Sequence, residues 1–467
     1  MNGLTVLPAV ELLAMLRRKQ ISPLELADEY IQQIERLNPQ LHALVDFDAE
    51  RVREQARALQ DAGGARGPLF GLPMTVKASI ATAGYRCELG SLLHRGHVPR
   101  ENATVVDRAI QVGAVILGTT NCPEFLMAYE TDNRLYGRTA NPWNTERTAG
   151  GSSGGEAAAI AAGLSAAGLG SDSGGSVREP AHFTGICSLK PTPGRIPSRG
   201  HLAAGDGPFS ILGAIGPMAR TVRDITLLFI TLSGQDERDP VSPPIGVRNE
   251  SLEDLKRVPI GFFEEDGPVT VETRQVVRDA ARALESQGFK VRPFKPQALE
   301  EARQLWWKFF VRGGAMLLDP LVKTRHAELS PTFLDFLSIA HREPPLSAEE
   351  LLSAWMDLDY VRRKLLAEME SFPILLCPVC AIPAFRHGER SWDVDGRRLE
   401  YLDAMRYTQW FNLLGAPAAV VPVGRSPEGL PIGVQIAGRP FEDERVLGIA
   451  AAVEAGFGYK PPPLTVP

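Results

Sequence analysis

The sequence predicts an α/β fold, with a mixed, twisted β-sheet core flanked by many α-helices. Short apolar runs such as Met74-Thr75-Val76 and Ala114 to Leu117 alternate with helix-like segments, as in chains whose strands cross a covered sheet. The chain has 467 residues, of which 44% are hydrophobic and 23% charged, so it can bury a large core. It shows no internal repeat. We expect a single α/β domain over 1–467.

The start of the chain is predicted to be helical. Ala9 to Lys19 is amphipathic, and Ser22-Pro23-Leu24-Glu25 has the pattern of a capping box with proline at the first helical position. We therefore expect a helical N-terminal layer at about 1–65.

The tract from 137 to 200 is rich in glycine and serine, yet it contains an alanine-rich helix from Glu156 to Ala162. A flexible linker does not explain such a helix, so we interpret the tract as a system of active-site loops. The segment from Asn141 to Thr148, which leads into it, is predicted to be turn-like rather than a strand.

A polar, proline-rich connection after Gly234 predicts the start of a more variable, substrate-side subdomain at about 245–370. Its beginning has the order of one βαβ unit, and helices with exposed aromatic residues are expected to follow. After these helices the chain returns to strands, followed by a helix. The βαβ unit is Arg257 to Phe263, Val271 to Gln287 and Lys290 to Phe294, and the aromatics are Trp306, Trp307, Phe309 and Phe310. The later strands are Ile374 to Leu376, Ala418 to Val421 and Ile432 to Ile436, and the helix is Glu442 to Glu454.

Charge and composition exclude several classes of partner. A formal charge of -6 argues against binding to nucleic acid or to an anionic membrane, because both need clustered Lys and Arg. No apolar run reaches the roughly 18 residues of a membrane span, and the N-terminus has no basic region of a signal peptide. Five scattered cysteines suit a reducing compartment. We expect a cytoplasmic protein without nucleic-acid or membrane partners.

Two glycine and serine loops carry the strongest chemical signal. Gly150 to Gly155 runs into a helix, and Gly170 to Arg178 follows one helix later. Glycines let the backbone approach a ligand closely, and successive N–H groups in such turns bind anions. The loops therefore predict a site for an anion or for an oxyanion.

Three chemistries could use these loops. Phosphate binding fails because the sequence has no P-loop lysine motif and no third glycine of a dinucleotide fingerprint. Gly150 to Gly154 matches the Gly-x-Ser-x-Gly nucleophile elbow. That motif requires a preceding strand, whereas the segment before Gly150 is predicted to be turn-like. In the third interpretation Ser176 is a nucleophile, and backbone N–H groups of Ser173 to Ser176 face the oxyanion.

The third interpretation needs a base for Ser176. None of the eight histidines lies in a comparable loop. A buried lysine can replace histidine, because desolvation favours the neutral amine. Lys77, which follows an apolar strand-like run, is the candidate.

At this point the chain resembles the amidase signature family, which includes fatty acid amide hydrolases and glutamyl-tRNA amidotransferase A subunits. The resemblance spans essentially the full chain and implies the amidase-signature fold. It is carried by Gly71 to Lys77, Thr120 to Phe125, Asn141 to Asn144, Gly150 to Pro193, Gly216 to Arg220, Asn412 to Ala418 and Leu430 to Gln435.

The resemblance implies a Ser-Ser-Lys triad that hydrolyses a carboxylic amide through an acyl-enzyme. Ser176 would attack the carbonyl, Ser152, on a cis peptide in the family, would relay the proton, and neutral Lys77 would be the base. The implied oxyanion hole is the backbone of Ser173, Gly174, Gly175 and Ser176, and the implied supporting residues are Ser153, Asp172 and Arg178. No metal or cofactor is implied. The chain departs from the family at Ala78, where many members have Asp, and at Ser173, where Thr or Ile is commoner.

The substrate is left open between aliphatic amides, anilides, carbamates, esters and fatty acyl amides. Met405 stands where the glutamine-hydrolysing amidotransferase A subunits have an Asp, which argues against a glutaminase. Such a glutaminase and a non-catalytic binding subunit of the same fold remain the alternatives, and a homodimer is kept open. Apolar and aromatic side chains are expected to form the substrate pocket, namely Met127, Tyr129, Trp306, Phe310, Trp392 and Trp410.

Overall fold

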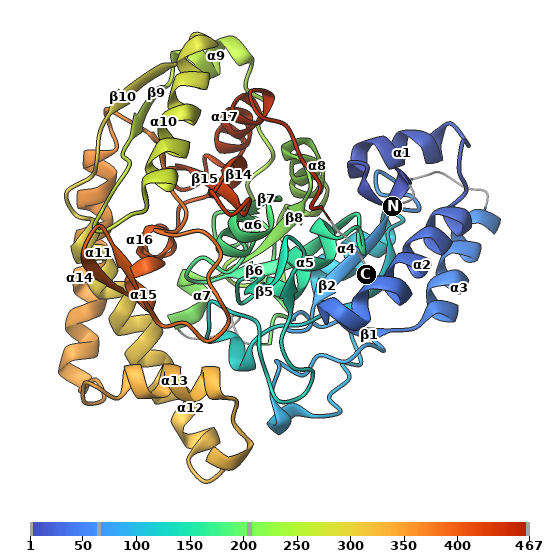
Figure 1. Cartoon of the computed structure of the whole chain (residues 1–467), viewed down its shortest axis with the longest axis horizontal. Helices are drawn as coiled ribbons and strands as arrows, with labels where there is room; N and C mark the ends of the chain where they lie inside the picture. The colour runs from blue at the N-terminus through green and yellow to red at the C-terminus, as the bar shows by residue number, and fades with distance from the viewer. Residues whose placement is uncertain (1–2, 63–66, 203–207, 464–467) are drawn as a thin grey trace.

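The computed structural model describes residues 3–62, 67–202 and 208–463. Within these residues an 11-stranded mixed sheet runs through the molecule and is flanked by helices (Figure 1). This confirms the predicted α/β class. The strand order is β1 (Leu44–Phe47), β3 (Val115–Thr120), β2 (Pro73–Lys77), β6 (Ala167–Asp172), β8 (Ala214–Ala219), β7 (Cys187–Lys190), β14 (Ala418–Arg425), β15 (Pro431–Gly438), β11 (Ile374–Pro378), β9 (Pro259–Phe262) and β10 (Lys290–Pro293).

The sheet combines parallel and antiparallel pairs. β2 pairs in parallel with β3 on one side and with β6 on the other, where Met74 stands opposite Ala167 and Val76 opposite Leu169. β9 pairs in parallel with β10 and with β11. Because parallel neighbours end at the same edge of a sheet, the carboxyl ends of β2 and β6 meet there.

The N-terminal layer contains α1 (Ala9–Arg17), α2 (Pro23–Leu41) and α3 (Ala49–Asp61). The predicted capping box is present, since Ser22 Oγ accepts the N–H of Glu25 and the Glu25 carboxylate accepts the N–H of Ser22. The layer is not purely helical, because β1 lies between α2 and α3 and joins the edge of the main sheet.

The expectation that 141–148 is turn-like was wrong. This segment contributes to a small antiparallel hairpin of β4 (Ala140–Asn141) and β5 (Asn144–Thr148), which forms its own two-stranded sheet. The Asn141 side chain stabilises the tight connection, because it accepts the N–H of Trp143 and donates to the carbonyl of Thr148. β5 is therefore not a strand of the central sheet. It leads into α5 (Gly154–Ala161), and α6 (Arg178–Thr184) follows β6.

The predicted βαβ unit is confirmed as β9, α10 (Val271–Ser286) and β10. Its strands extend the main sheet through β11, so the segment at 245–370 is joined to the core rather than folded around a separate sheet. Its helices are α11 (Leu299–Trp306), the π-helix η4 (Trp307–Arg312), α12 (Gly313–Val322), α13 (Pro331–Ala340) and α14 (Ala348–Glu368).

The aromatics predicted to be exposed on these helices include two that are buried. Trp306 and Phe309 are each 1% exposed. Trp306 is covered because α11 packs against α14 and against α16 (Arg406–Leu414), and the Phe309 ring of η4 contacts Trp355 of α14. Remaining elements are η1 (Gly3–Val6), η2 (Leu92–His94), α4 (Thr104–Gln111), η3 (Glu124–Leu126), α7 (Pro208–Leu212), α8 (Val222–Leu232), α9 (Leu252–Arg257), η5 (His326–Glu328), β12 (Ser391–Val394), β13 (Arg397–Glu400), α15 (Tyr401–Ala404) and α17 (Asp443–Ala455).

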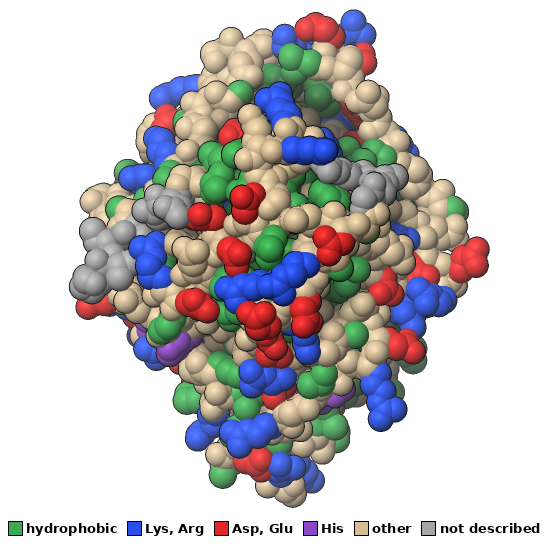
Figure 2. Space-filling view, turned by 90° about the vertical axis from the view of Figure 1, so that its right-hand side faces the viewer, with side chains coloured by type: hydrophobic (Ala, Val, Ile, Leu, Met, Phe, Trp, Pro, Cys, Tyr) green, Lys and Arg blue, Asp and Glu red, His purple; other side chains and the backbone are tan. Residues whose placement is uncertain are grey.

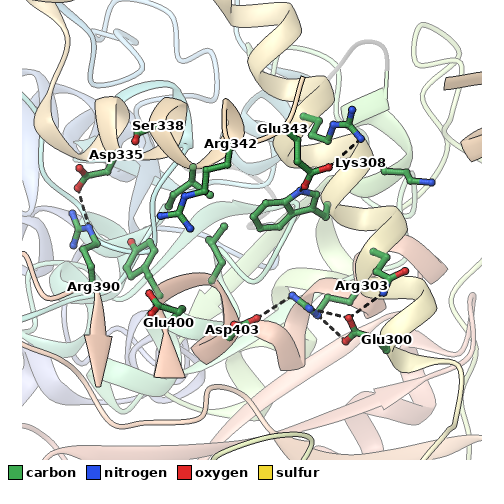
Figure 3. Close-up of a pocket in the computed structure, with 16 residues that line it drawn as sticks. Glu300, Arg303, Lys308, Asp335, Ser338, Arg342, Glu343, Arg390, Glu400 and Asp403 are labelled. Atoms are coloured by element: carbon green, nitrogen blue, oxygen red, sulfur yellow. Dashed lines mark hydrogen bonds and ion pairs between the residues drawn. The ribbon is translucent and has the colours of Figure 1, made fainter. Parts of the chain in front are cut away.

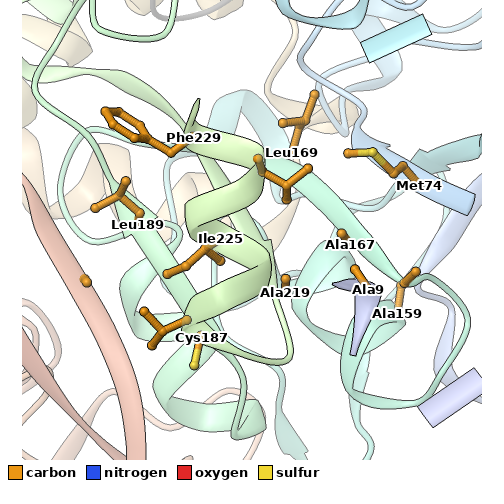
Figure 4. Packing of buried hydrophobic residues seen from close by; sticks show 14 of the residues in the cluster. Ala9, Met74, Ala159, Ala167, Leu169, Cys187, Leu189, Ala219, Ile225 and Phe229 are labelled. Atoms are coloured by element: carbon orange, nitrogen blue, oxygen red, sulfur yellow. The ribbon is translucent and has the colours of Figure 1, made fainter. Parts of the chain in front are cut away.

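Apolar side chains hold the helices on the sheet. Figure 4 shows Ile225 and Phe229 of α8 beside Cys187 and Leu189 of β7, all of them in one buried cluster. Each such side chain contributes about 1.5–3 kcal/mol when fully buried. The cluster fixes the strands whose ends carry the polar residues described below.

The surface mixes both signs of charge. On the face shown in Figure 2, Lys and Arg side chains are interspersed with Asp and Glu. No helix in the described part of the chain has both the length and the apolar composition needed to cross a bilayer.

Candidate active site

Lys77 ends β2 with its side chain completely buried. Its Nζ donates to Ser152 Oγ at 2.6 Å and to Ser171 Oγ at 3.1 Å. Ser171 lies near the end of the neighbouring strand β6. The parallel pairing of β2 and β6 thus brings a lysine and two serines together at one edge of the sheet.

Burial lowers the pKa of Lys77 to about 8, although Cys122, Asp172 and Glu156 act in the opposite direction. Glu156 on α5 is also fully buried, and burial raises the pKa of its carboxyl to about 8 even though the hydroxyls of Thr75 and Thr120 donate to it. Both shifts favour the uncharged form. A neutral amine is therefore accessible at this lysine near neutral pH.

Ser152 lies in the first glycine loop, where the Gly151–Ser152 peptide bond is cis, as the resemblance implies. The Gly151 N–H donates to Glu179 Oε2 at 3.0 Å, and Thr131 Oγ1 donates to the carbonyl of Gly150 at 2.8 Å. A Cβ on Gly151 would lie 2.5 Å from the carbonyl oxygen of Ala128. Only glycine therefore allows the loop to approach the neighbouring chain this closely.

The second loop is organised around Asp172 at the end of β6. Its carboxylate accepts the N–H groups of Gly175 at 2.8 Å and Val177 at 3.1 Å, and it forms a fully buried ion pair with Arg178. Burial alone would raise the pKa of Asp172, but the charge and hydrogen bonds of Arg178 hold the pKa well below its ordinary value. The carboxylate therefore stays ionised and fixes the turn that presents Ser176.

Arg178 connects this turn to the C-terminal part of the chain. It donates to the Thr408 carbonyl at 3.1 Å, to Gln435 Oε1 at 2.7 Å and to Asn412 Oδ1 at 2.5 Å. These partners are buried. The sequence offered only a weak indication of these three partners of Arg178. Asn412 and Gln435 lie in segments that carry the family resemblance, but Thr408 lies outside them.

Three backbone N–H groups of the second loop are free to bind an oxyanion. Across residues 3–62, 67–202 and 208–463, the N–H groups of Ser173, Gly174 and Ser176 have no hydrogen-bond acceptor. The N–H of Gly175 is not free, because it donates to Asp172. Of the four residues expected to form an oxyanion hole, three therefore have an N–H group without an acceptor in the described structure.

Two aromatic side chains hold the peptide groups of this loop. Trp306 Nε1 donates to the carbonyl of Ser173 at 2.9 Å, and the Tyr129 hydroxyl donates to the carbonyl of Gly174 at 2.8 Å. In a trans peptide the N–H points away from the carbonyl. Trp306 thus turns the N–H of Gly174 to the opposite side of the loop.

Ser176 lines two small adjoining cavities. The serine cavity, about 20 Å³, is lined by Phe125, Leu126, Met127, Ser152, Ser171, Ser173, Ser176, Phe209 and Phe310. The apolar neck, about 30 Å³, includes Ser176, Gly174, Met127, Tyr129, Trp306 and Phe310 in its lining. Ser152 lines only the first of them.

Four of the six side chains expected in the pocket line the neck, namely Met127, Tyr129, Trp306 and Phe310. The expectation for Trp392 and Trp410 is corrected. Trp392 lies on the β12–β13 hairpin, donates to Glu389 and lines a separate cavity. Trp410 faces the helical core from α16 and is 2% exposed.

The supporting residues Ser153, Asp172 and Arg178 all lie in these two loops. Ser153 Oγ contacts the backbone N–H and carbonyl of Ser171, each at 3.3 Å. Sequence reasoning missed Ser171 and Glu156, both of which adjoin Lys77. The signal for Ser171 was its place in the second glycine and serine loop, Gly170 to Arg178, whereas the pairing of its strand with β2 is seen only in the structure.

The histidine nearest in sequence to the second loop has a structural place. His182 is buried between Ile382 and Gly433, and burial lowers its pKa to about 4. No group of His, Cys, Asp and Glu in the described residues is arranged to hold a metal ion.

Comparisons with known proteins identify the family of this chain. Residues 25–447 match the Amidase family. The chain is 36% identical to the A subunit of glutamyl-tRNA(Gln) amidotransferase from Roseiflexus castenholzii, over 97% of this chain and 95% of that protein. It is 31% identical to the indoleacetamide hydrolase of Bradyrhizobium diazoefficiens, over 96% of this chain and 86% of that protein.

A solved structure gives the same result for the fold. The crystal structure of a bacterial aryl acylamidase of the amidase signature family superposes with a TM-score of 0.85 at 27% identity, over 97% of this chain and 96% of that one. The chain belongs to the amidase signature family and is an amidase, an enzyme that hydrolyses amide bonds.

Proposed function

We propose that this amidase hydrolyses a carboxylic amide through a Ser-Ser-Lys triad, with Ser176 as nucleophile, Ser152 as proton relay and Lys77 as base. The observation that carries the proposal is the 2.6 Å hydrogen bond between Lys77 Nζ and Ser152 Oγ in a fully buried environment. The lowered pKa of Lys77 supports its role as base. Ser152 and Ser176 share the serine cavity.

In the acylation step, Ser176 Oγ attacks the carbonyl carbon while its proton passes to Ser152, whose own proton passes to neutral Lys77. The N–H groups of Ser173, Gly174 and Ser176 then stabilise the oxyanion. When the carbon–nitrogen bond breaks, Lys77 returns the proton through Ser152 to the leaving nitrogen. Water hydrolyses the acyl-enzyme by the same route in reverse. Anilides, esters and carbamates suit the same acyl chemistry.

A glutamine-hydrolysing amidotransferase A subunit is the second candidate, because the matched relative from Roseiflexus castenholzii carries that name. Met405 opposes it. This side chain is fully buried, and its sulfur accepts the Cys380 thiol at 3.3 Å. A thioether cannot bind the ammonium group of glutamine as a carboxylate would. Ammonia release from glutamine by the purified chain would support this second candidate over the first.

A non-catalytic subunit of the same fold is the third candidate. It is disfavoured because the triad residues are all present and two of them are hydrogen-bonded. We further propose one domain that acts on a small amide without nucleic-acid or membrane partners, either alone or as a homodimer. A cytoplasmic location is supported by the five cysteines, which are all free thiols.

The triad is tested by labelling with a fluorophosphonate, followed by peptide mapping by mass spectrometry. We expect a single label on Ser176 that is lost in Ser176→Ala and reduced in Lys77→Ala. Ser338→Ala is the matched control, since Ser338 is an exposed serine away from Lys77, and it should label like the wild type. Label on Ser152 would favour a nucleophile elbow instead, and label on neither serine would favour the non-catalytic subunit.

A further inference from the structure

A much larger cavity, of about 610 Å³, adjoins the neck, and we call it the outer cavity (Figure 3). Its lining comes from α11, η4, α13, the residues Arg342 and Glu343 that follow α13, and the segment from Arg390 to Asp403. The neck and the outer cavity share the lining residues Asp335, Ile339, Arg390, Tyr401 and Leu402. The mostly apolar neck beside Ser176 therefore adjoins a space lined by charged side chains.

The carboxylates of the outer cavity already have basic partners. They are Glu300 with Arg303 at 2.9 Å, Asp403 with Arg303 at 3.1 Å, Asp335 with Arg390 at 2.9 Å, Glu343 with Arg312 at 3.3 Å, and Glu400 with Arg398 at 2.6 Å. A cationic ligand would have to compete with an arginine at each of these positions.

Two cations of the lining differ from the rest. Among the described residues, Arg342 and Lys308 have no carboxylate within ion-pair distance. Figure 3 shows the Arg342 guanidinium pointing into the outer cavity from beyond the end of α13, whereas Lys308 points away from it. Asp335, Ser338, Ile339 and Arg342 follow helical spacing and line the cavity together. The unpaired charge inside the cavity is thus positive.

The outer cavity lies on the acyl side of the reacting bond. Ser152 must deliver a proton to the leaving nitrogen, and it lines the serine cavity but not the neck. The leaving group therefore faces the serine cavity, whose volume of about 20 Å³ suits ammonia or a small amine. The acyl chain then occupies the neck, and its far end reaches the outer cavity.

We infer that the substrate is a primary amide whose apolar acyl chain ends in a carboxylate, and that Arg342 selects this anionic end. The inference rests on the proposed function. The guanidinium offers a fork of N–H donors that matches a carboxylate. The apolar neck excludes a charge from the middle of the acyl chain, because burial of an unpaired charge is costly.

The test compares monoamides of linear dicarboxylic acids with unsubstituted primary amides and ω-amino amides of equal chain length, by ammonia release. We expect kcat/KM to be highest for a carboxylate-ended chain long enough to cross the neck. The ratio of kcat/KM between the carboxylate-ended and the neutral amide should fall by about five-fold in Arg342→Gln, the upper range for an exposed ion pair. Arg342→Lys should restore part of the ratio, and added salt should lower it.

Lys308→Gln is the matched control, because Lys308 is a second unpaired cation of the lining but points away from the cavity. This variant should leave the ratio of kcat/KM between the carboxylate-ended and the neutral amide unchanged. A preference for neutral or ω-amino amides, or an equal loss in both variants, would overturn the inference while amide hydrolysis itself stands. Thermal-shift binding of the same amides to Ser176→Ala provides a readout without turnover. Stabilisation by the carboxylate-ended amide alone would support the inference even where the proposed chemistry fails, and equal stabilisation by all three classes would refute it.

Discussion

The lowered pKa of Lys77 makes a quantitative prediction about pH. An amine with a pKa of about 8 is about 10% neutral at pH 7, whereas an ordinary lysine at 10.5 is only about 0.03% neutral. Burial of Lys77 therefore increases the fraction of neutral amine about 300-fold at pH 7. We predict that kcat/KM rises about 50-fold between pH 6 and pH 8 and levels off above pH 9.

The neighbours of Lys77 refine this prediction. Cys122 keeps its proton throughout the range, because burial raises its pKa to about 12. Glu156, with a pKa of about 8, ionises in the same window and raises the pKa of Lys77 as it does so. Glu156→Gln should therefore move the rising limb to lower pH.

The assay is ammonia release from a neutral primary amide, which does not itself titrate between pH 6 and 9.5. Far-UV circular dichroism at each pH checks that the enzyme stays folded. A rate that is flat from pH 6 to 9, or that still rises steeply above pH 10, would refute a base with a lowered pKa.

Three substitutions test the surroundings of the site. Lys77→Met should abolish turnover. It should nevertheless stabilise the fold by about 1 kcal/mol at pH 7, because the penalty for a buried ammonium exceeds the loss of two hydrogen bonds. Urea unfolding measures this change in the free energy of unfolding, and a clear loss of stability would contradict the prediction. Asp172→Asn should cost about 3–5 kcal/mol in the same assay, because it leaves Arg178 buried without its counter-charge, so a change below 1 kcal/mol would show that the ion pair is dispensable. Trp306→Phe removes the donor to the Ser173 carbonyl and should lower kcat about 2- to 12-fold; steady-state kinetics would contradict this if only KM changed.

The local patterns of the sequence predicted the elements that carry the site. The capping box at Ser22, the strand ending at Lys77 and the two glycine loops were each visible as short-range signals of spacing and residue type. The hairpin at Asn141 to Thr148 was missed because β4 has only 2 residues and the 5 residues of β5 show no apolar alternation.

Long-range contacts could not be read from the sequence. Nothing local shows that Gly175 donates to Asp172, or that Trp306 reaches the Ser173 carbonyl from another part of the chain. The wrong placement of Trp392 and Trp410 has a similar cause. An aromatic residue in a core and one in a pocket cannot be distinguished in the sequence, because the difference lies only in how the side chain packs.

The strand order also affects how the enzyme is made. Among the described residues, β14 and β15 follow every other strand of the main sheet in sequence, yet they lie between β7 and β11 in the sheet. Until they emerge, the nascent chain holds two half-sheets whose open edges must wait for their partners. Arg178 likewise waits for Asn412 and Gln435. A chain that stops short of these strands carries Lys77, Ser152 and Ser176 but lacks Gln435, a buried partner of Arg178 in the second loop. We therefore expect such a chain to hold the second loop less firmly.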